Sequence, residues 1–141
     1  IFMNNIEEIN NSSFNNSSFN NTHGRKILKG LKTIKINDQS ELNEIGEKCF
    51  KGFPNLEKVE IITSKELTIG ESAFQDCSGL KTITISLTND YPSIIIKEGA
   101  FKNTTLLENI YITSTKNEDI NISLGDSAFN NSGLQYIGKF F

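Results

Sequence analysis

The side chains that could support nucleophilic or metal chemistry in this 141-residue chain are two cysteines and one histidine. Cys49 and Cys77 lie 28 positions apart without a Cys-x-x-Cys pair, and His23 stands in a polar run far from both. A structural zinc site uses about four Cys or His ligands at short, regular spacings, which these three residues cannot provide. A cysteine nucleophile needs a general base within reach, whereas the repeat described below places His23 on another turn. We therefore predict no enzyme activity, no metal site and no cofactor.

The charge balance and the length of the apolar runs argue against two classes of partner. Lys and Arg together number 14 against 17 Asp and Glu, so the net charge of −3 lacks the basic field that binds phosphate backbones. The longest apolar runs reach three or four residues, such as 94–96, whereas a membrane-spanning helix takes about 20. The first residues lack the charged-then-apolar pattern of a secretory leader, so any leader is expected to have been removed or never included. Neither nucleic-acid binding nor direct membrane insertion is expected.

Two short motifs recur along the chain and divide it into similar units. The first, Leu-x-x-Ile/Val-x-Ile, occupies residues 31–36, 56–61, 80–85 and 107–112 and begins again at 134–137. The second runs from an aliphatic residue to a phenylalanine five positions later, at 45–50, 69–74, 96–101 and 124–129. The Leu-to-Leu periods are 25, 24, 27 and 27 residues, and nearly all of this variation falls between the first motif and the second. Such periods are typical of leucine-rich repeats, which span roughly 20 to 29 residues.

The fixed spacings predict what each motif builds. The last two aliphatics of the first motif are two positions apart, so they point to the same face of a strand. The alternation before the second motif, as in Leu67-Thr68-Ile69, predicts a second short strand on an opposite wall. Stacked units then pair their strands in parallel and share one core. The predicted fold class is a leucine-rich-repeat solenoid of the α/β horseshoe class, dominated by β-structure: stacked parallel short strands on two walls, with little or no α-helix.

Three columns of the second motif are expected to be buried or to form a tight corner. The phenylalanines should stack as an aromatic spine, the small residues before them should press against the wall, and the column after the aliphatic residue suits a tight corner or a positive φ. In chain order these columns are Phe50, Phe74, Phe101 and Phe129; Cys49, Ala73, Ala100 and Ala128; and Gly46, Gly70, Lys97 and Gly125. Because Cys49 precedes its phenylalanine and Cys77 follows another, simple stacking does not align them, and free thiols are favoured over a disulfide.

The segment 69–83, IGESAFQDCSGLKTI, resembles the treponemal and BspA-like subclass of leucine-rich repeats at every defined position of that pattern. The resemblance covers roughly residues 27 to 141. Repeats of this subclass are found largely in surface or secreted proteins, where they look like adhesins for host matrix proteins or other cells. The resemblance therefore implies a non-catalytic protein-binding or adhesion module whose partner is another protein: host matrix, cell-surface or self. The alternatives are a cytoplasmic scaffold and a structural subunit that assembles end to end through the strand edge expected at residues 137–141.

The first 24 residues differ from the rest of the chain. Residues 1–24 are an Asn- and Ser-rich segment that we interpret as a degenerate capping turn, and residues 25–141 hold about four full turns and a partial fifth. The spacing of Ile6, Ile9 and Phe14 matches that of residues 42, 45 and 50, which would place Ile9 at the start of a second motif and Asn10 in the glycine column.

Two surfaces are candidates for binding a protein partner. The outward residues of the first motif form columns that together make a mixed-charge face ending in two tyrosines. The alternating charges of this face either pair across the strands and set their register or form a contact surface for a partner. The loops 86–93 and 113–121 are the alternative, unless they merely connect strands; their carboxylates lack the alternation of a calcium loop. The outward columns are Lys32, Glu57, Lys81, Glu108 and Gln135, and Lys35, Glu60, Thr84 and Tyr111 with Tyr136, and the loop candidates are Tyr91, Glu118 and Asp119.

Overall fold

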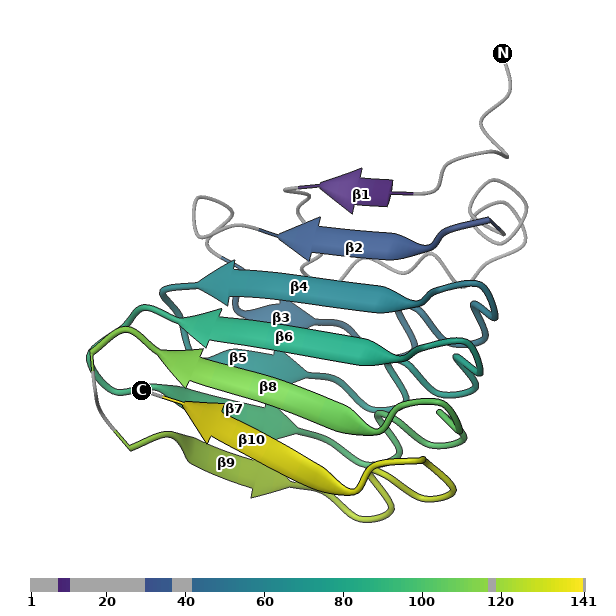
Figure 1. Ribbon diagram of the computed structural model, residues 1–141. Helices are drawn as coiled ribbons and strands as arrows, with labels where there is room; N and C mark the ends of the chain where they lie inside the picture. The colour runs from purple at the N-terminus through teal and green to yellow at the C-terminus, as the bar shows by residue number, and fades with distance from the viewer. Residues whose placement is uncertain (1–7, 11–29, 37–41, 117–118, 141) are drawn as a thin grey trace.

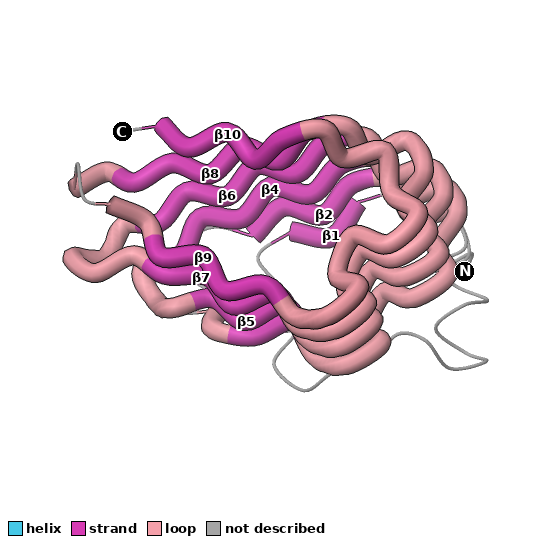
Figure 2. Tube along the Cα trace, turned by 90° about the horizontal axis from the view of Figure 1, so that it is seen from below, coloured by secondary structure: helices cyan, strands magenta, loops and turns pink. Residues whose placement is uncertain are grey.

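The computed structural model describes residues 8–10, 30–36, 42–116 and 119–140, and these ranges contain ten strands and no helix. The large sheet has the order β1 (Glu8–Asn10), β2 (Thr33–Ile36), β4 (Lys58–Thr63), β6 (Thr82–Leu87), β8 (Asn109–Ser114) and β10 (Tyr136–Phe140). The small sheet has the order β3 (Glu44–Ile45), β5 (Leu67–Ile69), β7 (Ser93–Ile96) and β9 (Asn121–Leu124). Every neighbouring pair is parallel. The strands stack one above another (Figure 1), and the sheets face each other beside a third side of stacked loops (Figure 2).

The register of the strands places equivalent motif residues side by side. Val59 pairs with Ile34 and with Ile83, and the same column continues through Ile110 to Ile137. Burial alternates along β4, β6 and β8, with the motif aliphatics on the buried side. These inward side chains meet those of the small sheet, such as Leu67 and Ile94, in one continuous core. The predicted solenoid of parallel strands on two walls is confirmed.

The phenylalanine spine forms on the third side, as predicted. The ring centroids of successive phenylalanines are 5.5, 5.3 and 5.3 Å apart, with interplanar angles of 16°, 3° and 5°. The backbone reinforces this stack, because the amides of Phe50, Phe74 and Phe101 each donate to a carbonyl oxygen of the next turn, at 2.8, 2.8 and 2.7 Å. The small column is buried as well, with exposures of 0 to 4%. Rings and backbone together hold one turn to the next where no strand is present.

The glycine column forms a tight corner, which is the first of the two alternatives given for it, and neither Gly70 nor Gly125 has a positive φ. A Cβ at Gly70 would lie 2.7 Å from the carbonyl oxygen of Ile45, and one at Gly125 would lie 2.6 Å from the amide nitrogen of Glu98. Close approach to the preceding turn is therefore what requires glycine. Positive φ occurs two residues further on, at 55° in Ser72 and 62° in Gly99. The structure gives no physical reason why Lys97 is tolerated in this column.

Neither Cys49 nor Cys77 is in a disulfide bond, and both side chains are buried. Cys77 donates its thiol hydrogen to the carbonyl oxygen of Phe50 on the preceding turn, with an Sγ–O distance of 3.0 Å. Cys49 lies in the small column beside the spine, with 0% exposure. Both thiols therefore act as core side chains, in agreement with the free thiols favoured from the sequence.

The alignment of the first turn was wrong. Ile9 pairs with Ile34, and Asn10 with Lys35, so β1 is a strand of the large sheet and Asn10 is not in the glycine column. The reason is that an aliphatic-x-x-Ile spacing occurs in both motifs, and the spacing alone cannot distinguish them. The paired residues Ile9 and Ile34 are 25 positions apart, which is an ordinary period for this chain. His23 and Phe14 lie outside the described residues.

Candidate protein-contact face

The large sheet presents a regular outer face, formed by the side chains that alternate with the buried aliphatics. On its three central strands these are Lys58, Glu60 and Ile62 of β4; Thr82, Thr84 and Ser86 of β6; and Asn109, Tyr111 and Thr113 of β8. Their positions follow from the period of two along a strand and from the burial of the intervening residues. We call this surface the outer face.

The chemistry of the outer face changes from one strand to the next. On β4, the ammonium of Lys58 lies 2.8 Å from a carboxylate oxygen of Glu60, and Ile62 is 41% exposed. On β6 and β8 the outward side chains are neutral, and the hydroxyls of Ser86 and Thr113 are hydrogen-bonded at 2.9 Å. This surface offers hydroxyl, amide and aromatic groups for binding, but no nucleophile paired with a base.

The register brings most of the predicted contact residues into one column. Lys35, Glu60, Thr84 and Tyr111 lie side by side on β2, β4, β6 and β8. Tyr136 pairs with Asn109 and so belongs to the neighbouring column, where Gly138 takes the place next to Tyr111. The predicted set is therefore two adjacent columns of one sheet, and its role in binding remains a prediction.

A row of charged residues lies at the amino ends of these strands. We call Lys32, Glu57, Lys81 and Glu108 the charged rim. Backbone hydrogen bonds align it: the amide of Glu57 donates to the carbonyl of Lys32 at 2.8 Å, and that of Lys81 to the carbonyl of Glu57 at 2.9 Å. All four side chains are exposed. Among the described residues, no ion pair within 4.0 Å joins Glu57, Lys81 and Glu108 to one another.

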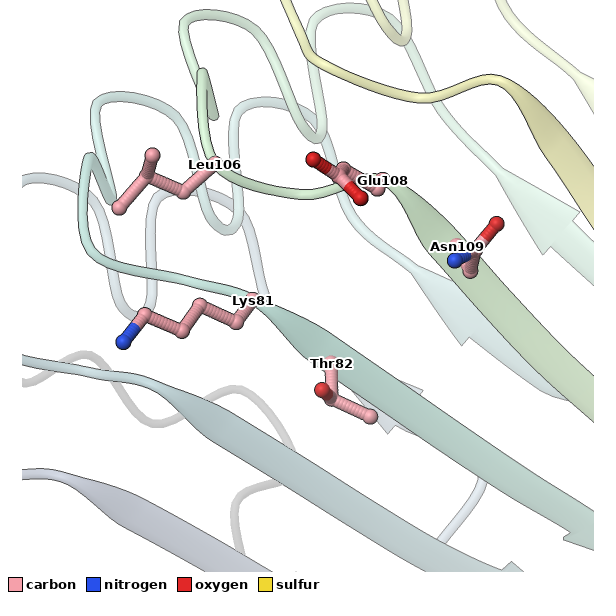
Figure 3. Close-up of a pocket in the computed structure, with 5 residues that line it drawn as sticks. All are labelled: Lys81, Thr82, Leu106, Glu108 and Asn109. Carbon is pink, nitrogen blue, oxygen red and sulfur yellow. The ribbon is translucent and has the colours of Figure 1, made fainter.

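An open hollow of about 360 Å³ lies where the charged rim meets the outer face (Figure 3). Its lining residues are Lys81, Thr82, Leu106, Glu108 and Asn109. Leu106 is 50% exposed, and Figure 3 shows the ammonium of Lys81 extending away from Glu108. The Oδ1 atom of Asn109 has no hydrogen-bond partner in the described part of the chain. The hollow thus combines an apolar wall with a carboxylate that is not paired to the neighbouring lysine.

Two of the three predicted loop residues, Tyr91 and Asp119, lie in the described part of the chain. Tyr91 is 89% exposed and Asp119 is exposed, whereas Glu118 lies outside the described residues. An ion pair of 3.7 Å between Asp90 and Lys116 joins the two loops. Over the ranges that the structure describes, no group of three or more His, Cys, Asp or Glu side chains is placed to hold a metal ion.

Sequence reasoning missed two columns on the third side. The first is an acidic column, which follows the glycine column in the sequence. The second is a ladder of side-chain hydrogen bonds: the amide of Asn103 donates to the carboxylate of Asp76 at 2.7 Å, and the amide of Asn131 donates to the side-chain oxygen of Asn103 at 3.0 Å. Residues of the ladder have φ values of 56° to 64°, which asparagine and aspartate tolerate better than most side chains. The shared spacing from the phenylalanines was the signal that could have revealed both columns. The acidic column is Glu47, Glu71, Glu98 and Asp126.

A protein-family model matches most of the chain. Residues 1–135 match six copies of the BspA type leucine rich repeat region, and the match includes the Asn- and Ser-rich segment. No curated protein and no solved structure matches the chain. Repeats of this family are associated with protein interaction and are generally non-enzymatic, and proteins that carry them are typically surface or secreted. The structure, where described, has no helix long and apolar enough to cross a membrane. With a matching repeat pattern along nearly its whole length, the chain belongs to the BspA type leucine-rich repeat family.

Proposed function

We propose that this chain is a non-catalytic adhesion module of a cell-surface or secreted protein, and that it binds a host matrix or cell-surface protein through the outer face. The observation that carries the proposal is the alignment of Lys35, Glu60, Thr84 and Tyr111 in one column across four paired strands. These side chains offer both charges, a hydroxyl and an aromatic ring on one continuous wall. Tyrosine is among the residues that contribute most to binding at protein interfaces.

The wall behind the outer face is rigid, and this supports the proposal. The inward neighbours Ile83, Ile85 and Ile110 are at most 1% exposed, and every residue of β6 pairs with both β4 and β8. A surface whose backbone is already fixed loses little conformational entropy when a partner binds. Tyr91 lies in a loop outside the strands and is 89% exposed, so little of the protein holds its side chain in a binding geometry.

Replacing Tyr111 with alanine is expected to weaken capture by immobilised fibronectin, laminin or collagen about thirtyfold, the effect of removing a residue worth about 2 kcal/mol at an interface. Tyr136→Ala, in the neighbouring column, is expected to weaken it as well. Tyr91→Ala is the matched control, because it removes the same side chain from the edge loop. Surface plasmon resonance on this panel measures the change.

The panel also gives outcomes that would contradict the proposal. Capture by none of these matrix proteins argues against the adhesion role. Capture that is lost with Tyr91→Ala but retained with Tyr111→Ala and Tyr136→Ala would transfer the contact to the edge loops.

A further inference from the structure

The charged rim alternates in sign along the stack. Lys32, Glu57, Lys81 and Glu108 follow one another on successive turns, and parallel strands set neighbouring turns about 4.8 Å apart. Glu57, Lys81 and Glu108 form no ion pairs with one another among the described residues. The charges of Glu57, Lys81 and Glu108 are therefore available to a partner that carries the opposite signs at the same spacing.

The charged rim has four members that alternate in sign. When the order of the four is reversed, every position changes sign, so a second rim in the reverse order places an opposite charge beside each member of the first. A two-fold axis that runs parallel to the strands, above the outer face and between β4 and β6, sets the outer faces of two copies against each other. It reverses the order of the turns in the second copy and keeps the amino ends of the strands of both copies together. It sets Glu57 opposite Lys81 of a second copy and Lys32 opposite Glu108 of that copy. We infer that the outer face associates with a second copy of this chain about such an axis.

The rest of the outer face is compatible with this arrangement. The axis sets Lys58 opposite Thr82, Glu60 opposite Thr84, and Lys35 opposite Tyr111, so no like charges meet. A lysine over a tyrosine ring is attracted to the face of that ring. Twisted sheets of the same hand also pack face to face with their strands nearly aligned. Both the charges and the shape of the sheets therefore permit the pairing.

The inference rests on the proposed protein-binding role of the outer face and names one partner for it. A dimer held by a small polar face and exposed charges is expected to be weak and salt-dependent. In sedimentation velocity of the parent chain, the weight-average sedimentation coefficient should rise with concentration, and this rise should diminish when NaCl goes from about 0.05 to 0.5 M. A chain that stays monomeric at all concentrations in low salt would overturn the inference. Because no matrix protein is present, that result would leave the adhesion role standing.

Charge reversal tests the pairing itself. Glu57→Lys and Lys81→Glu should each weaken self-association about tenfold or more, because each places like charges together twice across the axis. An equimolar mixture of these two variants should associate like the parent, since one then carries two cations and the other two anions at the centre of the rim. Glu71→Lys, in the acidic column, is the control and should leave association unchanged. Failure of the mixture to associate, or an equal loss with Glu71→Lys, would rule out the proposed axis.

Discussion

Replacing Phe74 with alanine is expected to lower the free energy of unfolding by about 3 to 5 kcal/mol, the usual cost of truncating a buried aromatic residue. Phe74 is 1% exposed and stacks between Phe50 and Phe101, at centroid distances of 5.5 and 5.3 Å. The cavity left by the ring cannot collapse easily, because backbone hydrogen bonds on both sides hold the turns at a fixed separation. Urea denaturation followed by circular dichroism measures the loss.

Phe129 provides the graded comparison for this prediction. Its ring is partly exposed, and its stacking partner in the spine is Phe101. Phe129→Ala should therefore cost less than Phe74→Ala, since less apolar surface is lost from the core. A Phe74→Ala protein as stable as the parent would show that the spine does not hold the turns together.

Gly70→Ala is expected to destabilise the protein by about 2 to 3 kcal/mol through overpacking. The new Cβ would lie 2.7 Å from the carbonyl oxygen of Ile45 and 2.9 Å from the amide nitrogen of Glu47, and both are backbone atoms that cannot rotate away. The turns would have to separate locally, which strains the hydrogen bond of 2.8 Å from the amide of Gly70 to Ile45. Thermal denaturation of the purified variant measures the effect.

Gly99→Ser is the matched control, because it tests positive φ without close approach. At Gly99 a Cβ would meet two side-chain oxygens, the hydroxyl of Ser72 at 3.4 Å and the amide oxygen of Gln75 at 3.9 Å, and no backbone atom. Ser72 and Ser127 hold the same column at a φ of 55°. The expected cost is about 1 kcal/mol, that of a left-handed residue with a side chain. A larger loss for Gly99→Ser than for Gly70→Ala would mean that backbone conformation, rather than close approach, dictates the glycines of this corner.

Much of the fold could be predicted because each unit repeats the same physical requirement. The column of Ile34, Val59 and Ile83 needed only a fixed spacing, which determines both the buried side of the strand and its register. Ile9 was assigned to the wrong sheet because its spacing fits either motif, and only the observed pairing with Ile34 distinguishes them. Close approach and positive φ both stayed open for the column of Gly70, because glycine satisfies either need and a sequence does not state which one applies; the structure shows close approach at Gly70 and positive φ at Ser72.

The sequence predicted which outward residues of the candidate site lie side by side, but not the shape of the surface that they form. The alignment of Lys35, Glu60, Thr84 and Tyr111 followed from the repeat. By contrast, the direction of the Lys81 side chain and the exposure of Leu106 depend on local geometry at the turns, so the hollow could not be anticipated. The sequence also could not show that Glu57, Lys81 and Glu108 form no ion pairs with one another. Neighbouring exposed charges gain little from pairing in water, so their spacing alone does not decide whether they pair.

The most direct test of the contact surface places one arginine on each wall. Thr84→Arg adds a large charged side chain to the middle of the outer face, and Ser123→Arg makes the same change on the small sheet, where Ser123 is exposed. Binding of both variants to whichever matrix protein captures the parent is measured by surface plasmon resonance, after circular dichroism confirms that they fold. Thr84→Arg is expected to weaken binding at least about tenfold, and Ser123→Arg to leave it unchanged. Equal binding by the two variants would contradict the assignment of the contact surface to the large sheet.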